Sequence, residues 1–257
     1  MISFKDAYQK VLALYQDFGH EQVSLETAMG RVLAEDIIAD RNFPPFNRAT
    51  KDGIALNYDA IEKGRTSFKI EGVLAAGMPA QLLLDTSNCL EIMTGAVVPN
   101  NADTVVMYEH LIIENGSATL TKNPNRGQDI HLDGSDQKKG DLVLKKHCIL
   151  SAAEIGVLAA VGKASVKVRT LPKVAIVSTG NELVEVEEIP LPHQIRKSNI
   201  HTLYAALSEE GIVPTKLHLT DEKASIKKAL DNTLKEHNAV LLSGGVSKGK
   251  FDFLPQV

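Results

Sequence analysis

The chain has 257 residues, of which 44% are hydrophobic and 23% charged, a balance that predicts a soluble globular protein with two or three compact units. Its net charge of −4 argues against general nucleic-acid binding, and the lack of a long apolar run argues against a membrane-spanning helix. The two cysteines, Cys89 and Cys148, have no CxxC spacing, which argues against a disulfide or zinc site and favours a cytoplasmic protein.

Two helices are predicted at the start of the chain. In the first, Ser3 can cap the helix, apolar residues recur on one face from residue 4 to residue 15, and Gly19 is the expected stop. The second is expected at residues 24–33, where apolar positions again fall on one side. These helices predict a helical platform at the amino-terminal end.

Residues 43–133 have a different texture, with short β-rich segments broken by proline and glycine. Within them, Asn115-Gly116 separates two strand-like runs, as expected for a two-residue hairpin turn. A helix is predicted again at 151–161, with Ser151 and Glu154 as a capping box, and a strand follows around Val166. Helical material on both sides of the β region predicts a β-rich lobe inserted into a helical platform.

From residue 171 onward, strand and helix patterns alternate. Strands are predicted at 174–177, 215–219 and 240–242, and helices at 198–210 and 222–234. This order predicts a parallel sheet with right-handed crossovers. Because three strands bury little surface, we expect the full protein to continue for about 130 to 150 further residues.

Together these segments predict a multidomain fold that combines α/β and β-rich parts. The expected domains are a discontinuous helical platform at 1–38 and 134–169, an inserted β-rich domain at 39–133, and an incomplete three-layer α/β domain at 170–257.

Ligands of parallel sheets bind at the carboxyl ends of the strands, where this sequence has two loops of small residues. The loops are Ser178-Thr179-Gly180-Asn181-Glu182 and Ser243-Gly244-Gly245-Val246-Ser247. Small residues let backbone amides approach an anion, and hydroxyl groups add donors. Carboxylates at Glu182, Asp221 and Asp252 could hold Mg²⁺ bridged to phosphate. The alternative interpretation is that the loops are tight turns and the acids are helix caps or solvated groups.

The β-rich region contains a second candidate set. Asp52 follows a proline-rich turn, and Thr94 ends a strand-like run in Glu91-Ile92-Met93-Thr94-Gly95-Ala96. Both are plausible ligand contacts. From composition alone, a turn carboxylate and a turn hydroxyl are the simpler interpretation.

The order of motifs resembles the molybdopterin molybdenumtransferase family, which includes the E domain of gephyrin. The matching segments cover nearly all of the chain: PFNRATKDG (45–53), IMTGAVVP (92–99), ADTVVM (102–107), GQDI (127–130), GSD (134–136), VSTGNEL (177–183) and SGGVS (243–247). The MTGA segment followed by VVM and Glu109 is specific, whereas the SGGVS loop is shared with related pterin-adenylating proteins.

The resemblance implies a reaction and its partners. The family binds adenylylated molybdopterin, breaks the adenylate link with Mg²⁺ present, and inserts molybdate to give molybdenum cofactor and AMP. It also implies a homodimer, with each active cleft between the α/β domain of one subunit and the β-rich lobe of the other. A further partner is the molybdopterin adenylyltransferase that supplies the substrate.

The resemblance also implies roles for individual residues. The expected catalytic residues are Asp52, Thr94, Glu182 and Asp221, and the expected magnesium ligands are Glu182, Asp221 and Asp252. The expected substrate-binding residues are Ser178, Thr179, Gly180, Asn199, Ser243, Gly244, Gly245, Val246 and Ser247. No side-chain nucleophile is expected, because an oxyanion or water can break the phosphoanhydride.

Five positions depart from the common family pattern: Lys51, His131, Ser135, Asn181 and Lys197. Lys51 stands where methionine is common and could pair with Asp52. Lys197 replaces an acidic residue and adds positive charge near the expected phosphate site.

Two alternatives to the molybdate-inserting enzyme remain, and the departures favour the first of them. One is an impaired relative that binds molybdopterin or acts as a scaffold. The other is an enzyme of the adenylyl-transfer step, against which the amino-terminal lobes argue. We expect the 257-residue chain alone to be inactive.

Overall fold

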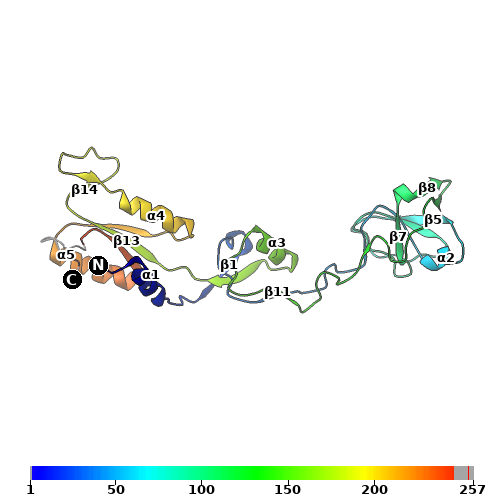
Figure 1. Cartoon of the computed structure of the whole chain (residues 1–257), viewed down its shortest axis with the longest axis horizontal. Helices are drawn as coiled ribbons and strands as arrows, with labels where there is room; N and C mark the ends of the chain where they lie inside the picture. Colours follow the sequence, from blue (N-terminus) through cyan, green and yellow to red (C-terminus); the bar gives the residue numbers. More distant parts are fainter. Residues whose placement is uncertain (1, 246–253, 255–257) are drawn as a thin grey trace. The chain divides into compact units, whose positions relative to one another are not determined.

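The computed structural model describes residues 2–245 and residue 254. The chain forms two compact units, one made of Met1–Glu35 with Lys145–Val257 and the other of Asp36–Leu144. We call the second the β unit and the first the α/β unit (Figure 1). The expected further division of the α/β unit into a platform and a domain at 170–257 stays a prediction.

The carboxyl-terminal half of the α/β unit contains the predicted parallel sheet. Its strands pair in parallel in the order β16-β13-β17, and Figure 1 shows helix α4 on one side of β13 and helix α5 on the other. The elements are β13 (Val174–Thr179), β14 (Leu183–Val184), β15 (Ile195–Arg196), α4 (Asn199–Glu209), β16 (Thr215–Leu219), α5 (Lys223–Glu236) and β17 (Ala239–Ser243). All six residues of β13 are buried, as expected for a central strand covered on both faces. The parallel sheet predicted from the sequence is thus confirmed.

The rest of the α/β unit mixes helices with a two-stranded antiparallel sheet. Its elements are α1 (Phe4–Ala13), β1 (His20–Ser24), the 3₁₀ turn η1 (Leu25–Thr27), α3 (Ala152–Ala160) and β12 (Ser165–Arg169). Strand β1 pairs with β12, which buries Val166 and Val168. The strand predicted around Val166 is therefore confirmed, whereas β1 was not predicted.

The helix predicted at residues 24–33 is wrong, because only the single 3₁₀ turn η1 forms there. Gly30 follows with a φ of +76°, a left-handed conformation that interrupts a helix. Beyond it, Val32 and Leu33 make antiparallel bridges to Ile149 and Val168. Leu33 is fully buried. Contacts with distant segments therefore bury apolar residues of this region although no helix forms.

Helix α1 begins as predicted, and its end differs from the expectation. The Ser3 side chain accepts a hydrogen bond from the Asp6 amide, and the helix ends at Ala13, well before Gly19. Its apolar side chains are exposed in the described part of the chain, with 86% of Phe4 and 54% of Tyr8 accessible.

The α3 capping box is present, with the Ser151 hydroxyl accepting from the Ala153 amide and Glu154 accepting from the Ser151 amide at 2.9 Å. We expect Ser151→Ala to lower the free energy of unfolding by about 1 kcal/mol, because one backbone donor at the helix start loses its acceptor. Urea unfolding measures this change, and Ser151→Thr, which keeps the hydroxyl, is the matched control. Equal losses in both variants would contradict the capping role.

The β unit is built on a six-stranded sheet in the order β7-β4-β6-β5-β9-β8. These strands are β4 (Gly53–Leu56), β5 (Ser67–Leu74), β6 (Cys89–Ile92), β7 (Thr104–Met107), β8 (Leu111–Glu114) and β9 (Ser117–Leu120). The unit also contains β2 (Ile37–Ile38), β3 (Arg48–Ala49), α2 (Tyr58–Glu62), the 3₁₀ turn η2 (Tyr108–His110), β10 (Ile130–His131) and β11 (Leu142–Leu144). The β8–β9 hairpin turns at Asn115 and Gly116, with φ of +51° and +74°, which confirms the predicted turn.

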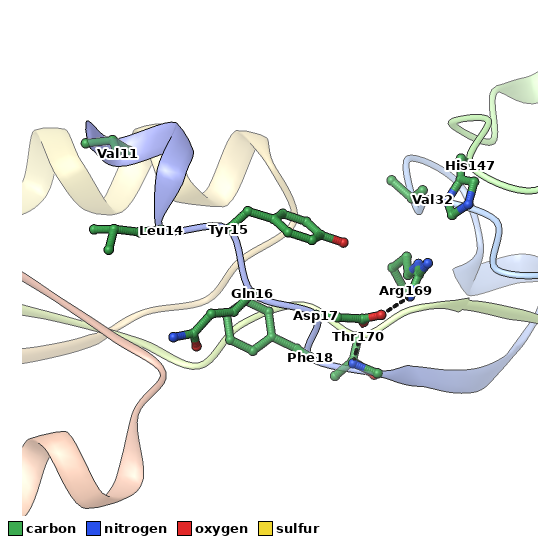
Figure 2. A pocket seen from close by; sticks show the side chains of 11 residues that line it. Val11, Leu14, Tyr15, Gln16, Asp17, Phe18, Val32, His147, Arg169 and Thr170 are labelled. Atoms are coloured by element: carbon green, nitrogen blue, oxygen red, sulfur yellow. Dashed lines mark hydrogen bonds and ion pairs between the residues drawn. The ribbon is translucent and has the colours of Figure 1, made fainter. Parts of the chain in front are cut away.

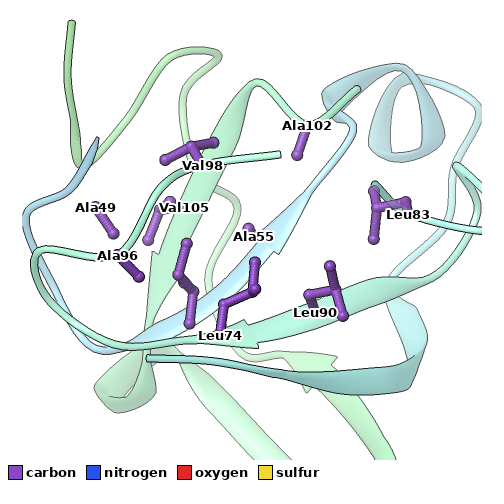
Figure 3. Close-up of a cluster of buried hydrophobic side chains, with 10 residues drawn as sticks. Ala49, Ala55, Leu74, Leu83, Leu90, Ala96, Val98, Ala102 and Val105 are labelled. Atoms are coloured by element: carbon purple, nitrogen blue, oxygen red, sulfur yellow. The ribbon is translucent and has the colours of Figure 1, made fainter. Parts of the chain in front are cut away.

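Small and branched side chains fill the core on one side of this sheet (Figure 3). They are Ala49, Ala55, Leu74, Leu83, Leu90, Ile92, Ala96, Val98, Ala102 and Val105. Gly53, at the start of β4, has no room for a Cβ, because that atom would overlap the Val106 carbonyl group of the neighbouring strand. The tight packing of β4 against β7 fixes the position of Asp52, the residue before Gly53.

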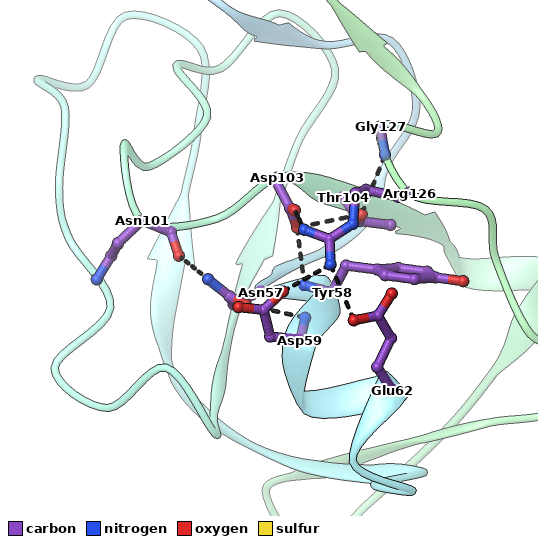
Figure 4. Close-up of polar contacts among 9 residues, drawn as sticks. All are labelled: Asn57, Tyr58, Asp59, Glu62, Asn101, Asp103, Thr104, Arg126 and Gly127. Atoms are coloured by element: carbon purple, nitrogen blue, oxygen red, sulfur yellow. Dashed lines mark hydrogen bonds and ion pairs between the residues drawn. The ribbon is translucent and has the colours of Figure 1, made fainter.

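Arg126 ties helix α2 to the loops around it (Figure 4). Its guanidinium lies 2.6 Å from Asp59, 3.2 Å from Glu62 and 2.8 Å from Asp103, and it packs over the Tyr58 ring at 5.0 Å. These ion pairs raise the pKa of Arg126, led by the hydrogen bond to Asp59. The network joins segments far apart in the sequence.

Neither cysteine forms a disulfide. Cys89 is buried in β6, and burial, with the nearby carboxylates Glu71 and Glu91, raises its thiol pKa to about 12. Within the described residues, none of the helices combines the length and apolar character that crossing a membrane requires.

Candidate functional site

The predicted loop residues of the α/β unit converge at the carboxyl end of its sheet. Ser178 and Ser243 pair in register on β13 and β17, and Gly180 follows β13 with its amide 3.3 Å from the Leu219 carbonyl oxygen of β16. The structure therefore brings together the two loops that the sequence placed 65 positions apart.

Asn199 joins this end of the sheet from the first turn of α4. Its side-chain amide donates to the Ser243 hydroxyl at 3.1 Å. A pocket of about 270 Å³ opens beside the pair, lined also by Thr202, Leu203 and Leu242. Asn199 and Ser243 thus lie at a pocket, as residues that contact a substrate must.

Thr179 has a buried polar atom at this end of the sheet. Its side chain is 5% exposed, and its Oγ1 has no hydrogen-bond partner among the described residues. A Cβ added at Gly244 or Gly245 would lie 3.0 or 2.7 Å from that oxygen. A side chain at either glycine would therefore crowd this oxygen. A buried hydroxyl without a partner is costly unless another group satisfies it.

Asn181 and Asp221 hold one another at the same end of the sheet. The Asn181 amide donates to Asp221 Oδ2 at 3.2 Å, and the Asp221 amide donates to Asn181 Oδ1 at 3.3 Å. The Glu182 carboxylate folds back over Gly180, where it occupies the space a Cβ would take. Two carboxylates thus stand beside the small-residue loops.

For the adenylylated substrate that the resemblance implies, we expect Asn181→Ala to raise the KM about fivefold with little change in kcat, because one hydrogen bond that positions Asp221 is lost. Asn181→Asp retains the side-chain acceptor and is the matched control. Steady-state kinetics of the full-length protein measure both variants. A lower kcat with an unchanged KM would instead assign Asn181 to the chemical step.

Three predicted site residues lie outside the described residues, namely Val246, Ser247 and Asp252.

The donors that are described fit a magnesium ion shared with a phosphate. The described residues contain no cluster of three or more histidine, cysteine or carboxylate side chains arranged to hold a metal. Mg²⁺, however, commonly takes one or two carboxylates and completes its shell with water and substrate phosphates. Glu182 and Asp221 are two such carboxylates, next to a loop with an unsatisfied hydroxyl.

In the β unit, Asp52 and Thr94 contact each other directly. The Thr94 amide and hydroxyl donate to Asp52 Oδ1 at 2.6 and 2.7 Å. The hydroxyl bond first, and then the amide bond, hold the pKa of Asp52 below its usual value. The two side chains are exposed, so the pair presents an ionised carboxylate at the surface.

Two residues beside this pair were missed by the sequence analysis. Tyr108 donates its amide to the Asp52 carbonyl at 3.1 Å and its hydroxyl to Glu91 in a short hydrogen bond. Burial, with the bond to Glu91, raises the pKa of Tyr108. In the sequence, the signal for Glu91 was an acidic residue inside the otherwise apolar run Cys-Leu-Glu-Ile of β6.

Lys51 could have paired with Asp52, but Lys51 is not among the groups that shift the pKa of this carboxylate, which are Thr94 and burial. Two other departures from the family pattern, His131 and Ser135, both contact Asp136. His131 Nε2 lies 2.8 Å and Ser135 Oγ 3.5 Å from Asp136 Oδ1.

Lys197 is close in sequence to the residues of the expected phosphate site, but its side chain pairs with Glu185. Its ammonium group pairs with Glu185 at 2.5 Å, and its side chain is 8% exposed. The pocket that it lines does not include Ser243 or Asn199.

A pocket of about 520 Å³ lies elsewhere in the α/β unit, between the segment after α1 and strand β12 (Figure 2). Its lining is mainly apolar, with one ion pair of 2.7 Å between Asp17 and Arg169. None of the predicted site residues lines it.

Two protein-family profiles match this chain. The profile of the MoeA N-terminal region (domain I and II) matches residues 2–162, and that of a probable molybdopterin binding domain matches residues 175–257. Over the whole chain, a molybdopterin molybdenumtransferase of Synechocystis sp. is 38% identical and one of Staphylococcus epidermidis is 33% identical. The chain spans 67% and 62% of the length of these two relatives.

A solved structure shares the fold. The molybdopterin biosynthesis MoeA protein of Pyrococcus horikoshii superposes with a TM-score of 0.84 at 30% identity, over 95% of this chain and 66% of that one. Since one family profile spans more than half of the residues and relatives match along the full sequence, this chain belongs to the molybdopterin molybdenumtransferase (MoeA) family.

Proposed function

We propose that the full-length protein inserts molybdate into adenylylated molybdopterin, releasing AMP and giving molybdenum cofactor, in the cytoplasm. The observation that carries the proposal is the buried Thr179 hydroxyl beside Gly244 and Gly245, at the carboxyl end of a parallel sheet, which has no hydrogen-bond partner in the described part of the chain. Such an end of a sheet is where ligands bind, and glycines let backbone amides approach a phosphate. The two relatives from Synechocystis sp. and Staphylococcus epidermidis are molybdopterin molybdenumtransferases, which supports this substrate.

The proposal gives each set of residues a role. Thr179, Asn199 and Ser243 bind the adenylylated end of the substrate with the two glycines between them. Glu182 and Asp221 hold Mg²⁺, which when bound offsets the charge of the phosphoanhydride. Asp52, kept ionised by Thr94, is the catalytic carboxylate of the β unit.

The proposed active form is a homodimer that receives its substrate from the molybdopterin adenylyltransferase. Sedimentation of the full-length protein tests the dimer: a monomer at micromolar concentration would contradict it.

One assay separates the enzyme from a binding or scaffold protein. The full-length protein receives adenylylated molybdopterin, molybdate and Mg²⁺, and AMP and molybdenum cofactor are measured together. We expect both products in equal amounts. A folded protein that binds the nucleotide and releases neither product would favour the scaffold function, which the departures at Lys51, His131, Ser135 and Lys197 motivate.

A further inference from the structure

A second pocket, of about 250 Å³, lies between the start of α4 and strand β16. Its polar lining comes from Lys197 and His201 at the start of α4, from Lys216 and His218 on β16, and from Glu185. His218 Nδ1 lies 3.1 Å from the Ser178 hydroxyl, so the pocket adjoins the end of β13. It shares no lining residue with the pocket at Asn199 and Ser243.

Lys197 is the unusual residue of this pocket. Lysine side chains are rarely buried unless they are paired, and this one is 8% exposed. Its ammonium group has three N–H donors, and among the described residues one acceptor meets it, Glu185 Oε1 at 2.5 Å. The Glu185 side chain is 55% exposed, so a buried cation here is held by an acid that solvent reaches.

The surroundings of Lys197 favour an anion. Lys216 and two imidazole groups line the pocket, and His201 belongs to the first turn of α4. Ser198, at the N-cap of α4, makes no side-chain capping bond, so the amides of this turn have no capping side chain. Lys197 lowers the pKa of Glu185, chiefly through their hydrogen bond, and it also lowers that of His218, after burial.

We propose that this pocket binds a small tetrahedral oxyanion, with the Lys197 ammonium as the main contact and the Glu185 carboxylate as the group that the anion displaces. The pocket is smaller than those of drug-sized ligands, which begin at about 300 Å³. Phosphate, sulfate and molybdate share the required shape and charge. The inference is independent of the proposed function, because it concerns a pocket that the substrate-binding residues do not line.

The displacement model predicts opposite effects for the two members of the ion pair. Glu185→Gln removes the internal competitor and tightens oxyanion binding about fivefold, the size of effect that a half-exposed ion pair can have. Lys197→Met keeps the buried stem and removes the charge, which weakens binding at least about tenfold. A purely structural ion pair would give no change in oxyanion binding for either variant.

The test follows the imidazole signals of His201 and His218 by NMR while phosphate, sulfate or molybdate is added to the full-length protein at low ionic strength. The signals are assigned with His201→Gln and His218→Gln. We expect both imidazole signals to shift as the anion saturates the pocket. Comparing the affinities for phosphate, sulfate and molybdate shows which of the three the pocket prefers. The shifts must persist in Asn199→Ala, which alters the neighbouring pocket and leaves this one intact.

Lys228→Met, on α5, removes one positive charge away from the pocket and is the control for net charge. Equal affinities for wild type, Lys197→Met and Glu185→Gln would overturn the proposal, as would the absence of any shift in wild type. If Lys197→Met does not fold, Glu185→Gln decides, since tighter binding supports the displacement model and unchanged binding refutes it.

Discussion

Replacing Gly53 with alanine is expected to lower the free energy of unfolding by about 3 kcal/mol or more. The added Cβ would overlap the Val106 carbonyl oxygen and lie 2.8 Å from the Met107 Cα. Both atoms belong to the backbone of β7, which pairs along its whole length with β4. Strand β7 cannot move away without breaking its hydrogen bonds to β4, so the steric overlap cannot be relieved by a small shift.

Gly72→Ala is the matched control in the same sheet. Its added Cβ would meet Leu90 Cδ2 at 3.4 Å, an ordinary contact, so we expect a change within about 1 kcal/mol. Hydrogen exchange at the amides of β4 and β7, followed in rising urea, measures both variants. Identical protection in the two would mean that β4 and β7 are not packed as closely as described.

Replacing Asp52 with asparagine in the full-length protein is expected to lower kcat by about 100-fold, because the ionised carboxylate is lost while the hydrogen bonds of Thr94 keep an acceptor. The rate of AMP release measures the change. An unchanged kcat would remove Asp52 from the chemistry and leave it as a turn residue.

Thr94→Val tests how the carboxylate is kept ionised. The pKa of Asp52 lies below its usual value, so the group stays charged until the pH falls through that lowered value, and the proposed role needs the charged form. Without the hydroxyl, the pKa rises, and the acidic limb of the pH–rate profile moves to higher pH. Thr94→Ser retains the hydroxyl and should leave the limb in place, whereas a limb unmoved in Thr94→Val would mean that another group controls it.

The sequence predicted the elements whose signals are local. Helix α3 carries its capping box within four residues, the β8–β9 hairpin its Asn-Gly turn, and β13 a continuous apolar run. The residues also suggested Asp52 and Thr94 as one candidate set, and the family resemblance added their catalytic roles. Nothing in their spacing of 42 positions predicts the direct contact that the structure shows.

What the sequence could not predict depends on long-range contacts. The apolar pattern at 24–33 fits a helix, and the bridges of Val32 and Leu33 to distant segments override it. Arg126 is another example, because it pairs with Asp59 and Glu62 of helix α2 and with Asp103, all distant from it in sequence. Lys197 shows the same limit. Its position two residues before Asn199 predicted added positive charge near the phosphate site, but its ammonium group pairs with Glu185.

The two outer strands of the parallel sheet differ in their protection against aggregation. Among the described strands, β16 and β17 each have a partner on one side only. Strand β16 carries Lys216 and His218, and charged or polar groups on an edge discourage pairing with other chains. Strand β17, Ala-Val-Leu-Leu-Ser, has neither charge nor proline. A preparation of these 257 residues should therefore form β-rich aggregates through β17, and Leu242→Lys, at a 39% exposed position, should slow them.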